Sequence, residues 1–380
     1  MRLFSLTEEQ ELFRETVRRF ADDKVAPRAA EIDATGEFPW DVFEALKAAD
    51  LLGLHVLESY GGSGADAVTY SILIEEIARV CMSSSLIPGV NKLGSLPLLL
   101  AGSEEQKAHY LSEVARGEAM ISYCLTEAGS GSDAAAMTTT ARSDGDAFVL
   151  DGAKRFITNA GISKYYVVYA KTNPDAGPRG ISCFVVPSDA PGFSVGRYEH
   201  KMGIKGSTTA EVAFDGCRIP ADNLIGAEGD GFRIAMQTLD HSRLTIGAQA
   251  VGLARGAFEY ARDYAKEREQ FGQAIANFQA IQFMLADMAM RTEAARLLVY
   301  QSSAMSDANH PDLTLHSAYA KCFASDTAMS VTTDAVQVLG GYGYVADYPV
   351  ERMMRDAKIT QIYEGTNQIQ RVVIARQLLK

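Results

Sequence analysis

The chain has 380 residues, of which 47% are hydrophobic and 22% are charged. This length predicts two or three domains, and this composition excludes both a disordered chain and a small disulfide-stapled scaffold. Lys and Arg total 36 against 48 Asp and Glu, so the net charge is −12, and without a basic block the chain is unsuited to nucleic acid or to an anionic membrane surface.

Residues 1–118 are predicted to form a helical domain. Thr7 and Ser103 each stand three residues before a glutamine, which is the spacing of a capping box at a helix start. Further helices are expected between residues 39 and 53, which a proline and a glycine bracket, and over residues 66–80.

Residues 119–228 are predicted to form a β domain. Short segments rich in β-branched and aromatic residues alternate here with Asp-Gly and Pro-Gly turn pairs, and no helical pattern lies between them. This spacing favours a small antiparallel barrel or sandwich. The four clearest strands are expected at residues 148–150, 165–169, 181–186 and 211–214.

Residues 229–380 are predicted to be helical again. Segments near 231–266, 277–306 and 311–339 are long, rich in Ala, Met, Leu and Gln, and nearly free of proline. Helices of this length can build an antiparallel four-helix bundle. The expected fold is therefore α+β, with a helical domain, a middle antiparallel β domain and a C-terminal helical bundle.

Metal and targeting signals are not found in the sequence. The five cysteines are scattered without a C-x-x-C pair, and the histidines have no metal-ligand spacing, so redox chemistry here would need an organic cofactor. The acidic N-terminus lacks the apolar stretch of a signal peptide, and the nearest apolar run, residues 96–101, is far shorter than the ~18 residues of a membrane span. We therefore expect a cytoplasmic protein with no membrane span.

Residues 129–134 match the dinucleotide pattern G-x-G-x-x-A. A Rossmann site needs a long helix directly after the glycines, whereas residues 137–142 look like a strand, so the context argues against that fold. The glycines could still expose backbone N–H groups to a phosphate, or could form a plain interdomain loop.

Two segments carry charged residues at breaks between helices. Arg268 lies in a charged stretch that is either a solvated helix end or a phosphate clamp, because arginine presents a planar fork of donors. Glu364 lies in a short turn between two expected helices, next to Gly365. A carboxylate in an apolar cleft has a raised pKa and can act as a base, while the alternative is a helix-capping glutamate.

Together these segments resemble the acyl-CoA dehydrogenase family over essentially the whole chain. The motifs in register are 123–133 (YCLTEAGSGSD), 156–159 (FITN), 268–271 (R-x-QF), 337–341 (QVLGG) and 363–366 (YEGT). The resemblance implies an N-terminal helical domain, a middle β domain, a C-terminal four-helix bundle, bound FAD and a homotetramer.

The resemblance also implies a set of cofactor-binding residues. Thr126 would hydrogen-bond the flavin ring, Ser132 would lie near the pyrophosphate, and Thr158 would reach N5 from the other side. Arg268 and residues 337–341 would serve the FAD of a neighbouring subunit. The full implied FAD set is Tyr123, Cys124, Leu125, Thr126, Gly131, Ser132, Phe156, Ile157, Thr158, Arg268, Phe271, Phe278, Gln279, Gln337, Val338, Gly340, Gly341, Thr366, Asn367 and Gln368.

For catalysis the resemblance implies that Glu364 removes the α-proton of an acyl-CoA thioester while the β-hydrogen passes as hydride to flavin N5. The backbone N–H of Glu364 and an FAD hydroxyl would hold the thioester oxygen as an oxyanion hole. Electrons would leave to an electron-transfer flavoprotein. The implied substrate-binding residues are Ser132, Asp240, Arg243, Tyr363 and Gly365.

Three features of the sequence bear on the subfamily. Some relatives carry the base where Ser242 stands, so Glu364 favours the short-chain, medium-chain or short-branched type, and we expect C4-like substrates. Between residues 79 and 116 the only cations are lysines, which argues against a diacid substrate. Phe156 replaces a frequent tryptophan. An oxygen-using flavin oxidase or monooxygenase and a non-catalytic acyl-CoA-binding protein are the alternative functions.

Overall fold

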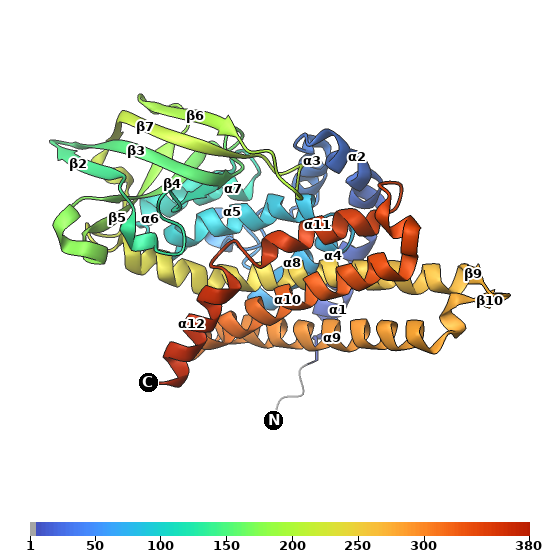
Figure 1. Ribbon diagram of the computed structural model, residues 1–380. Helices are drawn as coiled ribbons and strands as arrows, with labels where there is room; N and C mark the ends of the chain where they lie inside the picture. The colour runs from blue at the N-terminus through green and yellow to red at the C-terminus, as the bar shows by residue number, and fades with distance from the viewer. Residues whose placement is uncertain (1–4) are drawn as a thin grey trace.

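The computed structural model describes residues 5–380, and its N-terminal part is helical (Figure 1). Both predicted capping boxes are present: Thr7 caps the first helix and Ser103 caps the sixth. Two helices, α2 and α5, were not predicted, and α5 contains Pro88 and Pro97, which usually indicate helix ends. The helices are α1 (Glu8–Phe20), α2 (Ala29–Thr35), α3 (Trp40–Ala48), α4 (Ala67–Val80), α5 (Met82–Ala101), α6 (Glu104–Gln106) and α7 (Ser112–Ala115).

An eight-stranded sheet follows, in the order β6-β7-β3-β2-β4-β5-β8, with β1 paired to β4. Its strands are β1 (Ile121–Cys124), β2 (Thr140–Asp144), β3 (Ala147–Thr158), β4 (Tyr165–Lys171), β5 (Ile181–Pro187), β6 (Phe193–Tyr198), β7 (Thr209–Pro220) and β8 (Leu224–Ile225). The sheet is mixed and not wholly antiparallel, because β1 and β2 both pair with β4 in parallel. After the β2–β3 hairpin, β4 lies beside β1 and runs in the same direction. Strand propensity does not indicate which strands pair in parallel, so the sequence did not predict this arrangement.

The C-terminal part is helical, as predicted. Its helices are α8 (Gly231–Glu267), α9 (Gln279–Asp307), α10 (Leu313–Leu339), α11 (Pro349–Thr360) and α12 (Asn367–Leu378). A two-stranded hairpin of β9 (Glu269–Gln270) and β10 (Gln273–Ala274) connects α8 to α9. In Figure 1, α8, α9 and α10 run alongside one another through the length of the molecule, and the sheet lies above one end of them.

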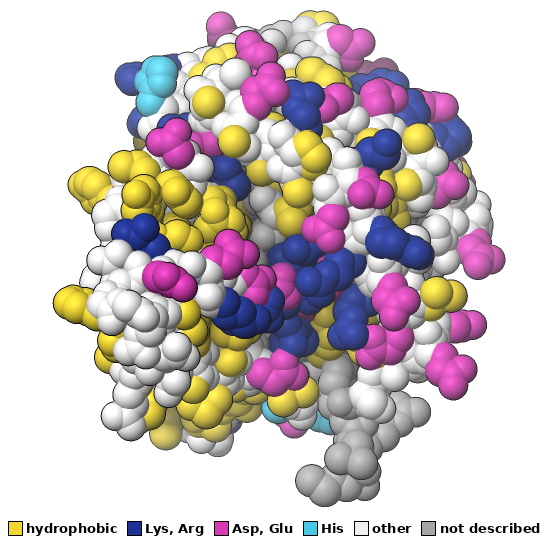
Figure 2. Space-filling view, turned by 90° about the vertical axis from the view of Figure 1, so that its right-hand side faces the viewer, with side chains coloured by type: hydrophobic (Ala, Val, Ile, Leu, Met, Phe, Trp, Pro, Cys, Tyr) yellow, Lys and Arg dark blue, Asp and Glu magenta, His cyan; other side chains and the backbone are white. Residues whose placement is uncertain are grey.

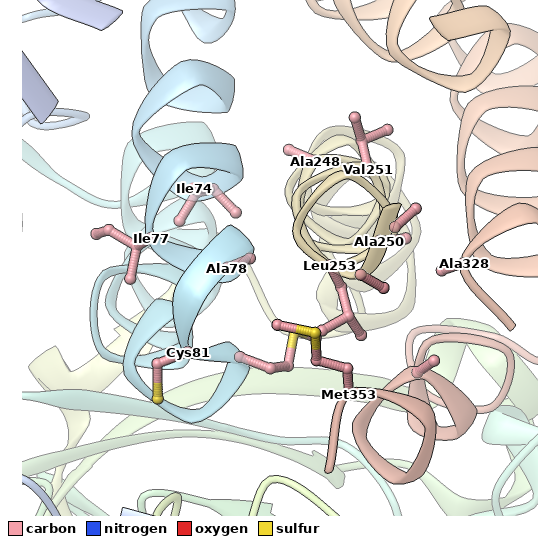
Figure 3. Close-up of a cluster of buried hydrophobic side chains, with 14 of the residues drawn as sticks. Ile74, Ile77, Ala78, Cys81, Ala248, Ala250, Val251, Leu253, Ala328 and Met353 are labelled. Atoms are coloured by element: carbon pink, nitrogen blue, oxygen red, sulfur yellow. The ribbon is translucent and has the colours of Figure 1, made fainter. Parts of the chain in front are cut away.

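The N-terminal and C-terminal helices share one hydrophobic core. Figure 3 shows Ile74 and Ala78 of α4, Val251 and Leu253 of α8, and Met353 of α11 in this core. Close packing of α4 on α8 requires glycine at position 252, where a Cβ would lie 2.2 Å from the carbonyl oxygen of Glu75. Over residues 5–380, none of the helices is long and apolar enough to cross a membrane.

Candidate active site

A cavity of about 500 Å³ lies where the sheet meets the helices. Four segments of the chain supply most of its lining: α5, the end of β1 with the loop after it, the end of β3, and α8. The turn at residues 363–365 and the outer face of α12 complete the lining. Because these segments come from all three parts of the chain, the cavity exists only in the folded whole.

Glu364 lies in this lining, in the turn between α11 and α12. Its backbone has a φ of +52°, in the left-handed region that non-glycine residues rarely occupy, and Gly365 follows at +90°. Left-handed backbone at a non-glycine residue costs about 1–3 kcal/mol and is concentrated at functional sites. The turn is held from behind, since Gln370 Nε2 donates to the carbonyl oxygens of Glu364 (3.2 Å) and Gly365 (3.0 Å).

The carboxylate of Glu364 accepts a hydrogen bond from Ser242 Oγ at 2.5 Å. The cavity leaves the residue half-buried, yet protein surrounds the carboxylate closely enough that burial raises its pKa to about 7. Ser242 and the cations Arg243 and Lys321 oppose this rise. A pKa near neutrality gives a carboxylate that is partly ionised and basic enough to take a proton from carbon at neutral pH.

Ser242 is the hydrogen-bond donor to the carboxylate of Glu364. Its hydroxyl stabilises the ionised form of Glu364, so Ser242→Ala raises the pKa of that carboxyl, and the acidic limb of the kcat/KM–pH profile moves to higher pH by about half to one pH unit. Ser242→Thr keeps the hydroxyl and serves as the control, with its limb near that of the unmodified protein. A Ser242→Ala limb at the unmodified position would contradict this role.

The backbone N–H of Glu364 donates no hydrogen bond to any protein group within residues 5–380. The N–H of Gly365 likewise donates to no protein group in this range, whereas the N–H of Tyr363 donates to the carbonyl oxygen of Ile359 at 3.0 Å. Buried N–H groups in folded proteins are nearly always paired, so a free donor beside a cavity is available to a ligand. The same residue therefore supplies a basic carboxylate and an unpaired donor.

Polar side chains from α8 extend the site on both sides of Glu364. Arg243 lines the cavity and pairs with Asp240 at 2.6 Å. Asp240 in turn accepts from Thr314 Oγ1 at 2.6 Å, and it stands behind Arg243, outside the lining. Further along α8, Gln249 Oε1 accepts from the hydroxyl of Tyr363 at 2.7 Å. Burial lowers the pKa of Arg243, although Asp240 opposes this.

Most of the expected flavin contacts from the middle domain lie in the same cavity as Glu364. The lining residues from that set are Tyr123, Leu125, Thr126, Gly131, Ser132, Phe156, Ile157 and Thr158. Cys124 is an exception, because alternation along β1 directs its side chain into the core of the sheet, which leaves only its backbone for a cofactor. A Cβ built on Gly131 meets no atom within 4 Å, so the loop is open at this position.

The expected contacts at the C-terminal ends of α8 and α10 line a second, separate cavity of about 480 Å³. Arg268, Val338, Gly340 and Gly341 line it, whereas Gln337 is exposed beside it. The Arg268 guanidinium lies 5.3 Å from the ring centroid of Tyr342. This cavity shares no lining residue with the cavity of Glu364.

Three further residues of the expected set lie where α8 leads into α9, outside the lining of the second cavity. Phe271 is 93% exposed and packs edge-on against Phe278, with ring centroids 6.0 Å apart. Gln279 is exposed at the start of α9. Figure 2 looks onto the end of the molecule that carries β9 and β10, where Lys and Arg side chains gather around a hollow.

Residues 366–368 do not line the cavity of Glu364. Thr366 caps α12 by accepting from the N–H of Ile369 at 3.3 Å. The side chain of Asn367 is buried among α10 residues, where its amide donates to Asp326 Oδ1 at 2.7 Å. Thr366, Asn367 and Gln368 line a neighbouring hollow of about 400 Å³.

Sequence reasoning missed one buried ion pair next to the site. Lys154 on β3 is completely buried, and its ammonium lies 2.8 Å from Glu127 Oε1. Glu127 also accepts from the backbone N–H groups of Thr138 (2.6 Å) and Thr139 (2.9 Å). The pair therefore closes the loop at residues 127–139, which contributes Gly131 and Ser132 to the cavity. A lysine at an inward-facing position of a strand was the available signal.

Comparison with known proteins places this arrangement in a family. Three family models match consecutive parts of the chain: the acyl-CoA dehydrogenase N-terminal domain over residues 7–118, the middle domain over 122–217 and the C-terminal domain over 229–379. A probable acyl-CoA dehydrogenase, fadE25 of Mycobacterium leprae, is 57% identical over 378 residues, which cover 100% of this chain and 97% of that protein.

Solved structures agree with the sequence comparison. Butyryl-CoA dehydrogenase from Megasphaera elsdenii is 41% identical and superposes with a TM-score of 0.96, over 99% of this chain and 100% of that one. A structure described as the electron transferring flavoprotein of Acidaminococcus fermentans contains a chain that is 46% identical, with a TM-score of 0.97 and 99% coverage of both chains. The protein is an oxidoreductase that uses FAD, and it belongs to the acyl-CoA dehydrogenase family.

Proposed function

We propose that the protein converts a saturated acyl-CoA thioester to the trans-2-enoyl-CoA, with Glu364 as the base that removes the α-proton. The observation that supports the proposal is that Glu364 has two useful groups at the same cavity: a carboxylate with a pKa of about 7 and a backbone N–H without a protein acceptor. The domains are proposed at residues 1–118, 119–228 and 229–380.

The chain's own groups account for the proton step. An α-proton of a thioester is weakly acidic, so the negative charge that develops on the thioester oxygen must be stabilised as the proton leaves. The N–H of Glu364 is the donor proposed for that oxygen, and the carboxylate of Glu364 accepts the proton. Arg243 lines the path beside them and favours the ionised carboxylate through its charge.

The cavity suits the cofactor of the family. Thr126, Ser132, Phe156 and Thr158 lie in one lining with Glu364, and the open space at Gly131 leaves room for the pyrophosphate. We propose the remaining implied contacts, including Cys124, Gln279 and Gln368, as further FAD-binding residues. When bound, FAD supplies the acceptor for the hydride that leaves the β-carbon. Phe156 is 56% exposed and would cover the ring where many relatives have tryptophan.

A short acyl group fits the inner end of the cavity. The hydrogen bond between Tyr363 and Gln249 bridges from the Glu364 turn to α8, and Gln249 Nε2 continues the bridge to Ser85 Oγ on α5 at 3.1 Å. These linked polar groups limit how far an apolar chain can extend between α5 and α8, because a longer chain would have to break them. The similarity to butyryl-CoA dehydrogenase supports a substrate of about four carbons.

We further propose a cytoplasmic homotetramer that passes its electrons to an electron-transfer flavoprotein. Large apolar side chains recur every seven residues along the outer face of α9, at Phe283, Met290 and Leu297, and all three are exposed in the single chain. Such a stripe is typical of a helix that packs against another copy. The second cavity, with Arg268, is then suited to a phosphate of the neighbouring subunit's FAD.

The function is tested by anaerobic titration of the purified flavoprotein with straight-chain acyl-CoAs of C4 to C16, followed by the visible absorbance of the flavin. We expect C4 to bleach the flavin most completely and the effect to fall with chain length. A yellow protein that no thioester bleaches would overturn the proposal. Hydrogen peroxide formed in air at the rate of turnover would favour an oxidase instead.

A further inference from the structure

We propose that Lys321 of α10 is a positioning residue for the base: it holds the turn that carries Glu364 and, by its charge, favours the ionised form of that carboxylate. The inference rests on the proposed function and adds a residue to its machinery. Lys321 lies 43 residues before Glu364 in the sequence, and nothing in the segment around it indicates contact with the active site.

The contacts of Lys321 converge on the base turn. The residue is fully buried, and its ammonium donates to the carbonyl oxygen of Gly365 at 2.8 Å and to Asn367 Oδ1 at 2.9 Å. Asn367 is itself fixed to α10 through Ser325 and Asp326. The ammonium therefore ties both sides of Thr366 to one helix and leaves the side chain of Glu364 as the part of the turn that faces the cavity.

The turn needs such an anchor because its backbone is strained. Glu364 and Gly365 both have positive φ. At a non-glycine residue such as Glu364 this conformation costs free energy, and it persists only where surrounding contacts hold it. Gln370 reaches the carbonyl oxygens of Glu364 and Gly365 from α12, so the Gly365 oxygen is bound from α10 and α12 together. Because these carbonyl oxygens are bound by α10 and α12, the turn is fixed, and the N–H and the carboxylate of Glu364 keep their positions at the cavity.

Among residues 5–380, no carboxylate lies within ion-pair distance of the Lys321 ammonium. Glu364 is nevertheless close enough to affect the pKa of Lys321 through its charge. Burial lowers the pKa of Lys321 to about 8, and the first influence opposing this is Glu364. Conversely, Lys321 opposes the rise in the pKa of Glu364, together with Arg243 from α8 and Lys92 from α5. Asp326 and Cys322 of α10 and Arg243 are the other ionisable groups that act on Lys321.

Three substitutions separate the two roles. Lys321→Met removes the donor and the charge, so we expect kcat to fall about 10²-fold and the acidic limb of kcat/KM to move up by about one pH unit. Lys321→Gln keeps a donor without a charge and should recover part of kcat while retaining the shifted limb. Lys321→Arg should keep the limb near its original position.

A matched control is Lys201→Met. Lys201 also donates to a backbone carbonyl, that of Ser207 at 2.7 Å, and burial also lowers its pKa, but Glu364 is not among the groups that act on it. We expect this variant to leave the acidic limb of the kcat/KM–pH profile unchanged. A Lys321→Met limb at the original pH, or a kcat within twofold of the unmodified protein, would overturn the inference.

A second readout does not depend on turnover. Hydrogen–deuterium exchange of the backbone at residues 363–371 should be at least about tenfold faster in Lys321→Met than in the unmodified protein, because a strained turn without its anchor opens more often. Lys201→Met should leave this segment unaffected. If the unmodified flavoprotein is not bleached by butyryl-CoA, the proposed function fails, whereas unchanged exchange in Lys321→Met overturns the role of Lys321.

Discussion

Glu364→Gln is expected to bind FAD and acyl-CoA but to lose at least about 10³-fold in the rate of flavin reduction by butyryl-CoA. The substitution keeps the size and the hydrogen bond from Ser242 and removes only the basic oxygen. General-base catalysis by a positioned group typically contributes 10² to 10⁴ in rate. The only other carboxylate in the lining of the cavity is Asp133, which is exposed on the loop after β1. Stopped-flow absorbance under anaerobic conditions measures the rate.

The control for this variant is its binding behaviour. FAD content and the dissociation constant of an unreactive acyl-CoA analogue should stay within a few-fold of the unmodified values, since the turn and its anchors are unchanged. A rate within tenfold of the unmodified protein, with binding intact, would show that another group takes the proton and would remove Glu364 from the mechanism.

Lys154→Met is expected to destabilise the protein by about 3–5 kcal/mol, because it leaves the carboxylate of Glu127 buried without its cation. Burial disfavours the ionised form of Glu127. The charge of Lys154 and the hydrogen bonds that Glu127 accepts outweigh this effect, and they lower the pKa of Glu127 to about 2. The stabilisation that Glu127 contributes is therefore present above its unfolded pKa and is lost as the pH falls through about 2. Urea unfolding at pH 7 measures the loss.

Two controls identify the cause of that loss. The double variant Lys154→Met with Glu127→Gln removes both charges and should be more stable than Lys154→Met alone. Lys164→Met removes a lysine from an exposed pair, 2.7 Å from Glu113, and should change stability by less than about 1 kcal/mol. Equal effects of Lys154→Met and Lys164→Met would contradict the importance of the buried pair.

Local structure was predictable from the sequence wherever a short-range rule decides it. The caps at Thr7 and Ser103 follow from two side chains three residues apart, and both are present. The strand at residues 165–169 is dense in β-branched and aromatic side chains, and it lies within β4. By contrast, β6 has mostly exposed residues and a central glycine, so it carries no clear strand pattern. Helix α5 was missed because its two prolines usually break helices.

The contacts that tune the base were not predictable. Ser242 and Glu364 lie 122 residues apart, and Lys321 reaches the Glu364 turn from another helix, so only the packing of α8, α10 and the turn brings them together. Glu364 was a candidate base from its turn alone, with a helix-capping glutamate as the alternative, and the family resemblance favoured the base. The same resemblance placed Thr366, Asn367 and Gln368 at the cofactor, a role that remains a prediction, and the structure puts them at a neighbouring hollow.

The most direct test of the account is the exchange of the substrate's α-hydrogen with solvent. Butyryl-CoA is incubated anaerobically in D₂O with the flavoprotein, and the deuterium content at the α-carbon is read by mass spectrometry. We predict that the unmodified protein incorporates deuterium and that Glu364→Gln does not, because Glu364 is the proposed base that takes the proton and returns it. Equal incorporation by both proteins would contradict the assignment of Glu364 as the base.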